Sequence, residues 1–228
     1  MNHKLRSFSL LMVVTAMLVV AGSSLLLAQD DLVSMHSTDL LSDESIAVPT
    51  GDEVDTSMWA KEGPYTIGFI NWSSANSWTQ QVDAELAHEV SLYPEIEEFI
   101  SLSADGDVNE QINQMEDLIS LGVDAILVIP VAVEPLAPAI DLATENGIPV
   151  VVFGARSASE NNITTLLANQ VNFGRVLGDF LMEELDCQGN VIVLNGITGN
   201  STSDDRRQGL LDAIAACPDG GTNVTILA

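Results

Sequence analysis

The chain has 228 residues, of which 33 are acidic and 7 are basic, and its formal net charge at pH 7 is −26. An acid excess this large disfavours nucleic acid as a partner, because a protein that neutralises phosphates needs lysine and arginine. It also disfavours a polybasic module for membrane surfaces. The hydrophobic fraction of 46% and the charged fraction of 18% are those of a globular chain, and they exclude a disordered polyelectrolyte.

The first residues have the pattern of an export signal. Lys4 and Arg6 precede an apolar run over 10–22, and small residues follow it up to Ala28. We therefore expect residues 1–28 to be a signal peptide, cleaved after Ala28, and the protein to be exported to the periplasmic or extracellular face of the cell envelope. The alternative is an uncleaved anchor, because the apolar run can be extended to about 20 residues, enough to span a bilayer.

The segment after the signal differs in composition from both of its neighbours. Residues 29–63 carry nine acids and one lysine, and no helix or strand period is sustained there. This composition predicts an acidic, mostly disordered linker.

A regular alternation of strands and helices begins at Tyr65. Apolar runs predict strands at 65–71, 99–102, 125–130, 148–153, 191–194 and 222–228. Helical spacing of apolar residues predicts helices at 78–93, 107–122, 135–146, 172–186 and 204–216. Several strands lack apolar–polar alternation, which is typical of strands buried on both faces of a parallel sheet. The predicted fold class is therefore α/β, with a doubly wound parallel sheet.

The helix at 107–122 has recognisable end signals. Asp107 followed by Glu110 has the spacing of a capping box at its start, and Gly122 is a typical C-terminal stop.

Ligands of such sheets bind beyond the carboxyl ends of the strands. The loops to search are 71–78, 103–107, 130–134, 154–162 and 195–204. None of them carries a dinucleotide, P-loop or nucleophile-elbow motif. The last loop, GITGNSTS, has glycines and hydroxyls without a lysine, so it is either a weak anion cradle or an ordinary turn.

Histidine chemistry is also not expected. His3 falls in the signal, His36 in the linker, and His88 in mid-helix, where we expect it to face solvent. The acids are scattered along the chain with no pair that suggests acid–base work. We therefore predict no catalytic residues, no metal site and no cofactor.

Neutral polar and aromatic residues are concentrated in the loop after the first strand. Asn76, Ser77 and Trp78 are its candidates for ligand binding, since an indole face covers C–H groups while amides and hydroxyls bond to ligand hydroxyls. The alternative for Trp78 is that its ring anchors the first helix to the core.

Two arginines lie in or beside strand-end loops of this acidic chain. The guanidinium groups of Arg156 and Arg206 could hold vicinal hydroxyls or a carboxylate. The structural alternatives are a surface pair of Arg156 with Glu160, and of Arg206 with Asp204 or Asp205.

The chain has two cysteines, Cys187 and Cys217, too far apart for a C-x-x-C motif and too few for a zinc site. In an exported protein they can form a disulfide, which would stabilise the fold by about 3–4 kcal/mol in the chain-entropy description. The alternative is two free thiols.

Several stretches between 65 and 228 resemble the exported sugar-binding proteins of ABC importers, of the ribose-binding, type I periplasmic type. They are IGFINWSSANSW, ADGDVNEQINQMEDLISLGVDAILVIP, AIDLATENGIPVVVF and GNVIVLNGITGNSTSDDRRQGLLDAI. The resemblance implies a clamp of two lobes that closes on a sugar. It assigns 64–170 to the N-terminal lobe and 171–228 to part of the C-terminal lobe, with the crossing near Asn169–Asn172.

The resemblance also implies roles for site residues. Asn76 and Trp78 match the family's ligand-contacting first loop, and Arg206 matches the second-lobe arginine that reaches the sugar. Many members carry a sugar-binding aspartate where this chain has Gly154, and Arg156 is displaced by one position from the usual arginine. The ligand-binding candidates are thus Asn76, Ser77, Trp78, Gly154, Arg156 and Arg206.

The implied function is a monomeric, non-enzymatic receptor that captures a sugar or polyol and delivers it to an ABC permease. The family's second lobe continues past the equivalent of Ala228, so we expect a second lobe that is incomplete in a truncated chain. The alternative function is a ligand-sensing clamp for a chemoreceptor or histidine kinase. A repressor domain and a secreted enzyme fit less well, because no DNA-binding motif and no catalytic motif is present.

Overall fold

The structure is a computed structural model that describes residues 54–227. The predicted signal peptide and most of the predicted linker lie outside the described residues. The described end of that linker contains one short 3-10 turn, η2 (Ser57–Trp59). Within residues 54–227, no helix is long and apolar enough to cross a bilayer.

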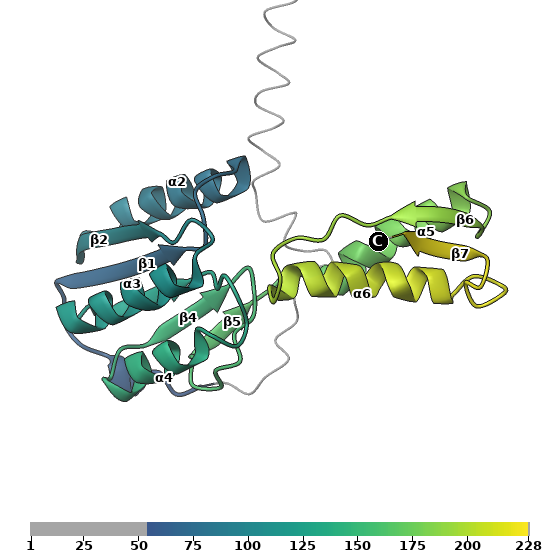
Figure 1. The fold of residues 1–228 in the computed structure, drawn as a ribbon. Helices are drawn as coiled ribbons and strands as arrows, with labels where there is room; N and C mark the ends of the chain where they lie inside the picture. Colours follow the sequence, from purple (N-terminus) through teal and green to yellow (C-terminus); the bar gives the residue numbers. More distant parts are fainter. Residues whose placement is uncertain (1–53, 228) are drawn as a thin grey trace, which may run out of the picture. The chain divides into compact units, whose positions relative to one another are not determined.

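Five parallel strands form the first sheet, in the order β2-β1-β3-β4-β5 (Figure 1). They are β1 (Tyr65–Asn71), β2 (Ile96–Ser103), β3 (Ala125–Val128), β4 (Val150–Phe153) and β5 (Thr164–Leu166). The helices that connect them are α2 (Ser77–Ser91), α3 (Val108–Leu121) and α4 (Ala137–Glu145). In Figure 1, α3 and α4 lie side by side in front of the sheet, and these two helices are in contact. The predicted α/β fold class with a parallel sheet is confirmed.

The strand order places a topological switch point between β1 and β3. From β1 the chain moves outward to β2, and it then returns to pair β3 with the other side of β1. Crevices beyond the carboxyl ends of the strands at such a point are the usual binding places of this fold class. The loops after β1 and after β3 are therefore the first to consider.

The core explains why these strands lack alternation. Phe69 and Ile70 are consecutive in β1 and both are fully buried. In β3 and β4 one face is fully buried and the other is half-buried. Helices on both faces of the sheet account for this pattern.

The ends of α3 follow the sequence signals in part. The Asp107 carboxylate accepts from the backbone N–H groups of Asn109 (2.8 Å) and Glu110 (3.3 Å), and Gly122 ends the helix at φ +69°. The reciprocal half of the predicted capping box is wrong. The Asp107 N–H donates to the Ala104 carbonyl, and the Glu110 carboxylate accepts from Gln114 instead.

A second, two-stranded parallel sheet contains β6 (Gly189–Ile192) and β7 (Val224–Leu227). Helices α5 (Gln170–Glu184) and α6 (Ser201–Ala215) pack against each other and share a small core with this sheet. Cys187 and Cys217 form a disulfide with Cα atoms 5.8 Å apart, so the alternative of two free thiols is wrong. The predicted division of the chain into lobes near residue 170 stays a prediction.

Several strands differ from the expectation: β2 begins three residues before its predicted start, and β3 and β4 are each two residues shorter than predicted. β5 was not predicted, because its three residues are all exposed and carry no apolar run. β6 begins two residues earlier than predicted, and Leu194 at the end of the predicted run is 93% exposed. Burial on both faces is wrong for β6: Val191 is buried, whereas Ile192 next to it is exposed, because the core with α5 and α6 covers one face.

Candidate ligand-binding site

The loop after β1 is held by a buried asparagine. The Asn71 side chain is fully buried and donates to the Asp83 carboxylate (3.1 Å) and to the Thr79 carbonyl (3.4 Å). The Ser74 hydroxyl donates to the other Asp83 oxygen (3.2 Å). The Asp83 carboxylate therefore ties the end of β1 and the middle of this loop to α2.

Asn76, Ser77 and Trp78 are all exposed at the start of α2. The Asn76 carboxamide oxygen accepts from the Thr79 N–H (3.0 Å), which makes Asn76 the N-cap of the helix. Its oxygen therefore has a structural role, and its Nδ2 group is the part that could donate to a ligand. The structure gives Ser77 no contact that distinguishes it from other exposed residues of α2.

The Trp78 ring lies against Gly154, far away in the sequence. A Cβ atom on Gly154 would stand 3.4 Å from Cη2 of Trp78 and 3.4 Å from a methyl of Ile129. The Trp78 side chain is 53% exposed. A residue with about half of its surface in water is a weak anchor to the core, and part of Trp78 is accessible beside the carboxyl end of β4.

Gly154 follows β4 and adopts φ +73°, where a side chain is strained. Its N–H donates to the Leu166 carbonyl (3.0 Å), and its own carbonyl accepts from the Thr202 hydroxyl (3.0 Å). Many members of the resembled family carry an aspartate at this position. In this chain the position is a glycine that lies against Trp78, and its two backbone groups bond to two other segments of the chain.

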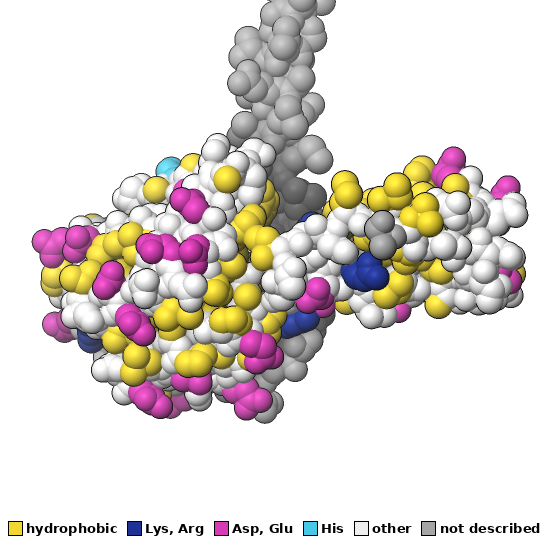
Figure 2. Space-filling model, viewed as in Figure 1, with side chains coloured by type: hydrophobic (Ala, Val, Ile, Leu, Met, Phe, Trp, Pro, Cys, Tyr) yellow, Lys and Arg dark blue, Asp and Glu magenta, His cyan; other side chains and the backbone are white. Residues whose placement is uncertain are grey.

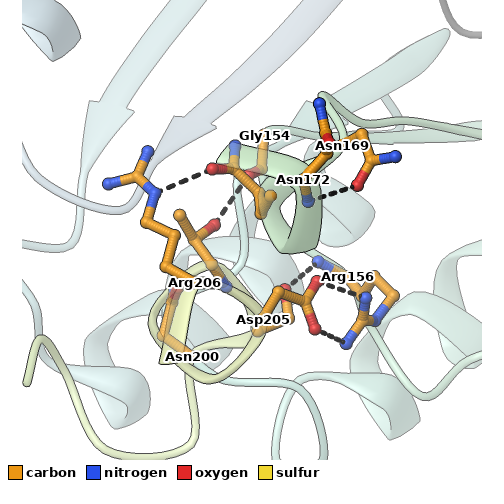
Figure 3. Close-up of polar contacts among 10 residues, drawn as sticks. Gly154, Arg156, Asn169, Asn172, Asn200, Asp205 and Arg206 are labelled. Atoms are coloured by element: carbon orange, nitrogen blue, oxygen red, sulfur yellow. Dashed lines mark hydrogen bonds and ion pairs between the residues drawn. The ribbon is translucent and has the colours of Figure 1, made fainter. Parts of the chain in front are cut away.

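Arg156 is paired with an acid on α6. Its two terminal nitrogens donate to the two carboxylate oxygens of Asp205, at 2.6 and 2.8 Å (Figure 3). These hydrogen bonds raise the pKa of Arg156 above its ordinary value against the opposing effect of burial. The expected surface pair with Glu160 is therefore wrong, because Asp205 takes its place.

Arg206 contacts neutral groups. Its Nε donates to the Gln170 side-chain oxygen (2.8 Å), and the guanidinium carbon lies 4.6 Å from the centre of the Phe173 ring. The ion pairs in the described part of the chain do not include Arg206, so the expected pairing with Asp204 or Asp205 is wrong. Figure 3 shows the outer end of this guanidinium pointing away from Arg156. Among residues 54–227 its terminal nitrogens have no hydrogen-bond partner, so they are donors that a ligand could use.

The loop GITGNSTS becomes the start of α6, and sequence reasoning missed its residues. The Asn200 side-chain oxygen accepts from the Thr202 N–H, while its Nδ2 group donates to the carbonyls of Pro130 (3.2 Å) and Val131 (3.1 Å). The Ser201 hydroxyl accepts from the Arg156 N–H (2.8 Å). An asparagine followed by two hydroxyl residues indicates a helix N-cap, but no local signal indicates these distant partners. The structure therefore uses this loop for internal contacts, which favours the ordinary turn over the anion cradle.

The loop after β3 is held from within the first sheet. Gln111 on α3 is fully buried; its amide donates to the Ile129 carbonyl (2.9 Å) and accepts from the Val131 N–H (2.8 Å). This one side chain fixes both sides of Pro130, where Asn200 then binds.

Two further expectations from the sequence concern metal binding and histidine chemistry. In the described range no cluster of His, Cys, Asp or Glu side chains could hold a metal ion. His88 is exposed, as expected. Figure 2 shows the acidic side chains scattered over the visible face rather than gathered. An open hollow lies beside the disulfide and is lined by residues of α5 and α6, but none of the candidate residues lines it.

Comparison with known proteins decides the family. The periplasmic binding protein domain family matches residues 67–228. The chain belongs to the periplasmic binding protein family. The resemblance expected from the sequence is thereby confirmed.

The relatives of this periplasmic binding protein domain are named for sugars and polyols. It is 31% identical over 122 residues to a xylitol-binding protein of Mycolicibacterium smegmatis, covering 54% of this chain and 35% of that protein. It is 28% identical over 170 residues to the galactofuranose-binding protein YtfQ of Escherichia coli, covering 72% and 52%. The crystal structure of a galactofuranose-binding protein matches with a TM-score of 0.61 at 27% identity, covering 72% of this chain and 55% of that one. The chain thus spans about half or less of the length of these relatives.

Proposed function

We propose that this domain belongs to an exported receptor that binds a sugar or a related polyol and delivers it to the permease of an ABC importer. The family assignment and the sugar-binding relatives support this proposal. We further propose that the receptor acts as a monomer and has no catalytic activity of its own. No cofactor is needed for such a role.

The observation that carries the proposal is the exposed Trp78 ring beside Gly154. Its accessible part lies at the carboxyl ends of β1 and β4, in the place where ligands of this fold class bind. An indole face suits the C–H face of a sugar ring, and Asn76 Nδ2 and the free nitrogens of Arg206 are donors for its hydroxyls. Both terminal nitrogens of Arg156 donate to Asp205, so we do not include Arg156 among the ligand contacts.

The test is titration calorimetry on the protein expressed from its gene. The ligands are ribose, xylitol, galactofuranose and L-arabinofuranose, because the names or titles of its relatives give these ligands. We expect Trp78→Ala to weaken binding about tenfold or more, since it removes the stacking face. Arg206→Ala should weaken binding by about 1.5–3 kcal/mol, the value of a charged hydrogen bond.

The control variant is Trp59→Phe, because Trp59 belongs to the described segment before β1 and not to the strand-end loops. It should leave the affinity unchanged. Equal affinity of wild type and Trp78→Ala for a bound sugar would remove Trp78 from the site, and the absence of binding by the wild type would contradict the proposal.

A further inference from the structure

The N-terminal part of α6 is attached to the loop after β4 by an ion pair with two parallel hydrogen bonds. Both oxygens of Asp205 accept from both terminal nitrogens of Arg156, at 2.6 and 2.8 Å. The Asp205 side chain is only 18% exposed, whereas that of Arg156 is 46% exposed. Paired, parallel hydrogen bonds of this kind are stronger and more directional than a single contact between exposed charges.

Hydrogen bonds next to the ion pair join the same two regions of the chain (Figure 3). The Arg156 N–H donates to the Ser201 hydroxyl, and the Thr202 hydroxyl donates to the Gly154 carbonyl. A little further away, the Val133 N–H donates to the Gly199 carbonyl (3.0 Å). Apart from the ion pair, these bonds involve neutral groups, so the Arg156–Asp205 pair is their one charged and salt-sensitive component.

Asp205 directly precedes Arg206 in the sequence. Fixing Asp205 to the loop after β4 fixes the turn of α6 from which the Arg206 side chain departs. The Arg206 guanidinium is then held by Gln170 and the Phe173 ring of α5, with its terminal nitrogens free. A change at Asp205 would therefore alter where those nitrogens lie without touching a ligand.

We propose that Arg156 and Asp205 are positioning residues: their ion pair clasps the N-terminal part of α6 to the loop after β4, and so sets the position of Arg206. The proposal rests on the proposed function only for the role that it gives to Arg206. In this proposal Arg156 belongs to the ion pair and does not contact the ligand. Asp205 is a further residue that affects ligand affinity, because it sets the position of Arg206.

The chain contains a matched control pair. Arg175 and Asp179 lie four residues apart on α5, joined by a single bond from Nε (2.7 Å), with side chains 38% and 51% exposed. This pair joins one helix turn to the next, whereas Arg156 and Asp205 join regions far apart in the sequence. Neutralising Asp179 removes the same charge without touching the clasp.

The test is amide hydrogen exchange on the full chain without ligand. The reporters are the N–H groups of Arg156 and Val133, because both donate across the contact to Ser201 and Gly199. We expect Arg156→Gln and Asp205→Asn each to speed their exchange about three- to tenfold, the range for a well-formed but partly exposed ion pair. Asp179→Asn should leave both reporters unchanged.

Two further measurements separate the ion pair from general loosening. The exchanged pair, Arg156→Asp with Asp205→Arg, should recover at least half of the lost protection on a logarithmic scale. Raising the salt from about 0.05 to about 0.5 M should speed reporter exchange in the wild type but not in Asp205→Asn, because salt screens only an existing pair. Wild-type exchange rates in Asp205→Asn, or no recovery in the exchanged pair, would overturn the clasp.

Ligand binding is measured separately from hydrogen exchange. For any sugar that the wild type binds, Asp205→Asn should weaken binding about three- to tenfold, and the exchanged pair should recover it. Unchanged affinity despite faster exchange would overturn the positioning of Arg206 while leaving the clasp. If the wild type binds no sugar, the proposed function fails, and the exchange data still decide whether the clasp exists.

Discussion

Gly154 occupies a backbone conformation that only glycine adopts without strain. At φ +73° a side chain is disfavoured by about 1–2 kcal/mol. In addition, its Cβ would stand 3.4 Å from both Trp78 and Ile129. The positive φ is therefore a physical reason why this position carries glycine rather than the aspartate of many family members.

We predict that Gly154→Ala lowers the free energy of unfolding by about 1–2 kcal/mol and shifts the fluorescence of Trp78. Urea unfolding and the emission spectrum measure the two effects. The control is Gly147→Ala, because Gly147 has a similar φ of +79° and no atom within 4 Å of the added Cβ. The control should lose comparable stability without the spectral shift, and an equal shift in both variants would contradict the contact with Trp78.

At the scale of the elements, the close approach of α5 and α6 depends on glycines. A Cβ on Gly174 would stand 2.0 Å from the Arg206 carbonyl oxygen, and one on Gly209 would stand 2.0 Å from the Val171 carbonyl oxygen. Both obstacles are backbone atoms, which cannot rotate away as a side chain does. The two helices must separate to accept either methyl group.

We predict that Gly174→Ala and Gly209→Ala each destabilise the chain by about 1–3 kcal/mol or more, the usual cost of overpacking. The direction of the stability change distinguishes a close helix contact from a free helix, because replacing glycine by alanine in a free helix stabilises that helix by about 1 kcal/mol. Thermal or urea unfolding followed by far-ultraviolet circular dichroism measures the change. A gain in stability would show that α5 and α6 do not touch as closely as described.

The separation of α5 and α6 should also disturb Arg206, since the Arg206 carbonyl is the obstacle at Gly174 and Gln170 of α5 binds the side chain. The same two variants are thus expected to weaken sugar binding, whereas a loss of stability without a loss of affinity would separate the helix contact from the site.

At the scale of the whole molecule, the chain carries a net charge of −26 and still uses single acids as structural acceptors. The Asp141 carboxylate accepts from the Ser159 hydroxyl (2.6 Å) and the Asn161 amide (2.9 Å), so that α4 is tied to the loop after β4. These bonds lower the pKa of Asp141 below its ordinary value of 3.8, the Ser159 bond having the larger effect. A lowered pKa means that Asp141 stabilises the fold above the unfolded value and that this contribution disappears as the pH falls through the folded one.

We predict that Asp141→Asn is less stable than the wild type at pH 7 and that the difference shrinks as the pH falls below about 4. Urea unfolding at a series of pH values measures it. Asp117→Asn is the control, since Asp117 is exposed on α3, and it should match the wild type throughout. A difference that stays constant down to the lowest pH would assign the effect to lost packing rather than to charge.

The sequence by itself determined the fold class and most element positions. Apolar runs without alternation, the cap at Asp107 and the stop at Gly122 are local signals, and β1 and the start of α3 lie where those signals predict. The departures include β5, which the sequence does not predict, and the shifted starts of β2 and β6. Short or half-covered strands carry no periodic signal, because their burial depends on which neighbours the chain supplies.

Only the tertiary structure decided the partners of the site residues. Sequence proximity suggested Glu160 for Arg156 and Asp204 or Asp205 for Arg206, but a side chain pairs with what lies near in space. The N-terminal part of α6 lies at the loops after β3 and β4, so that Asp205 pairs with Arg156, while Arg206 bonds through Nε to Gln170. The contact of Trp78 with Gly154 has the same origin, since the parallel order of the sheet brings the ends of distant strands to one edge.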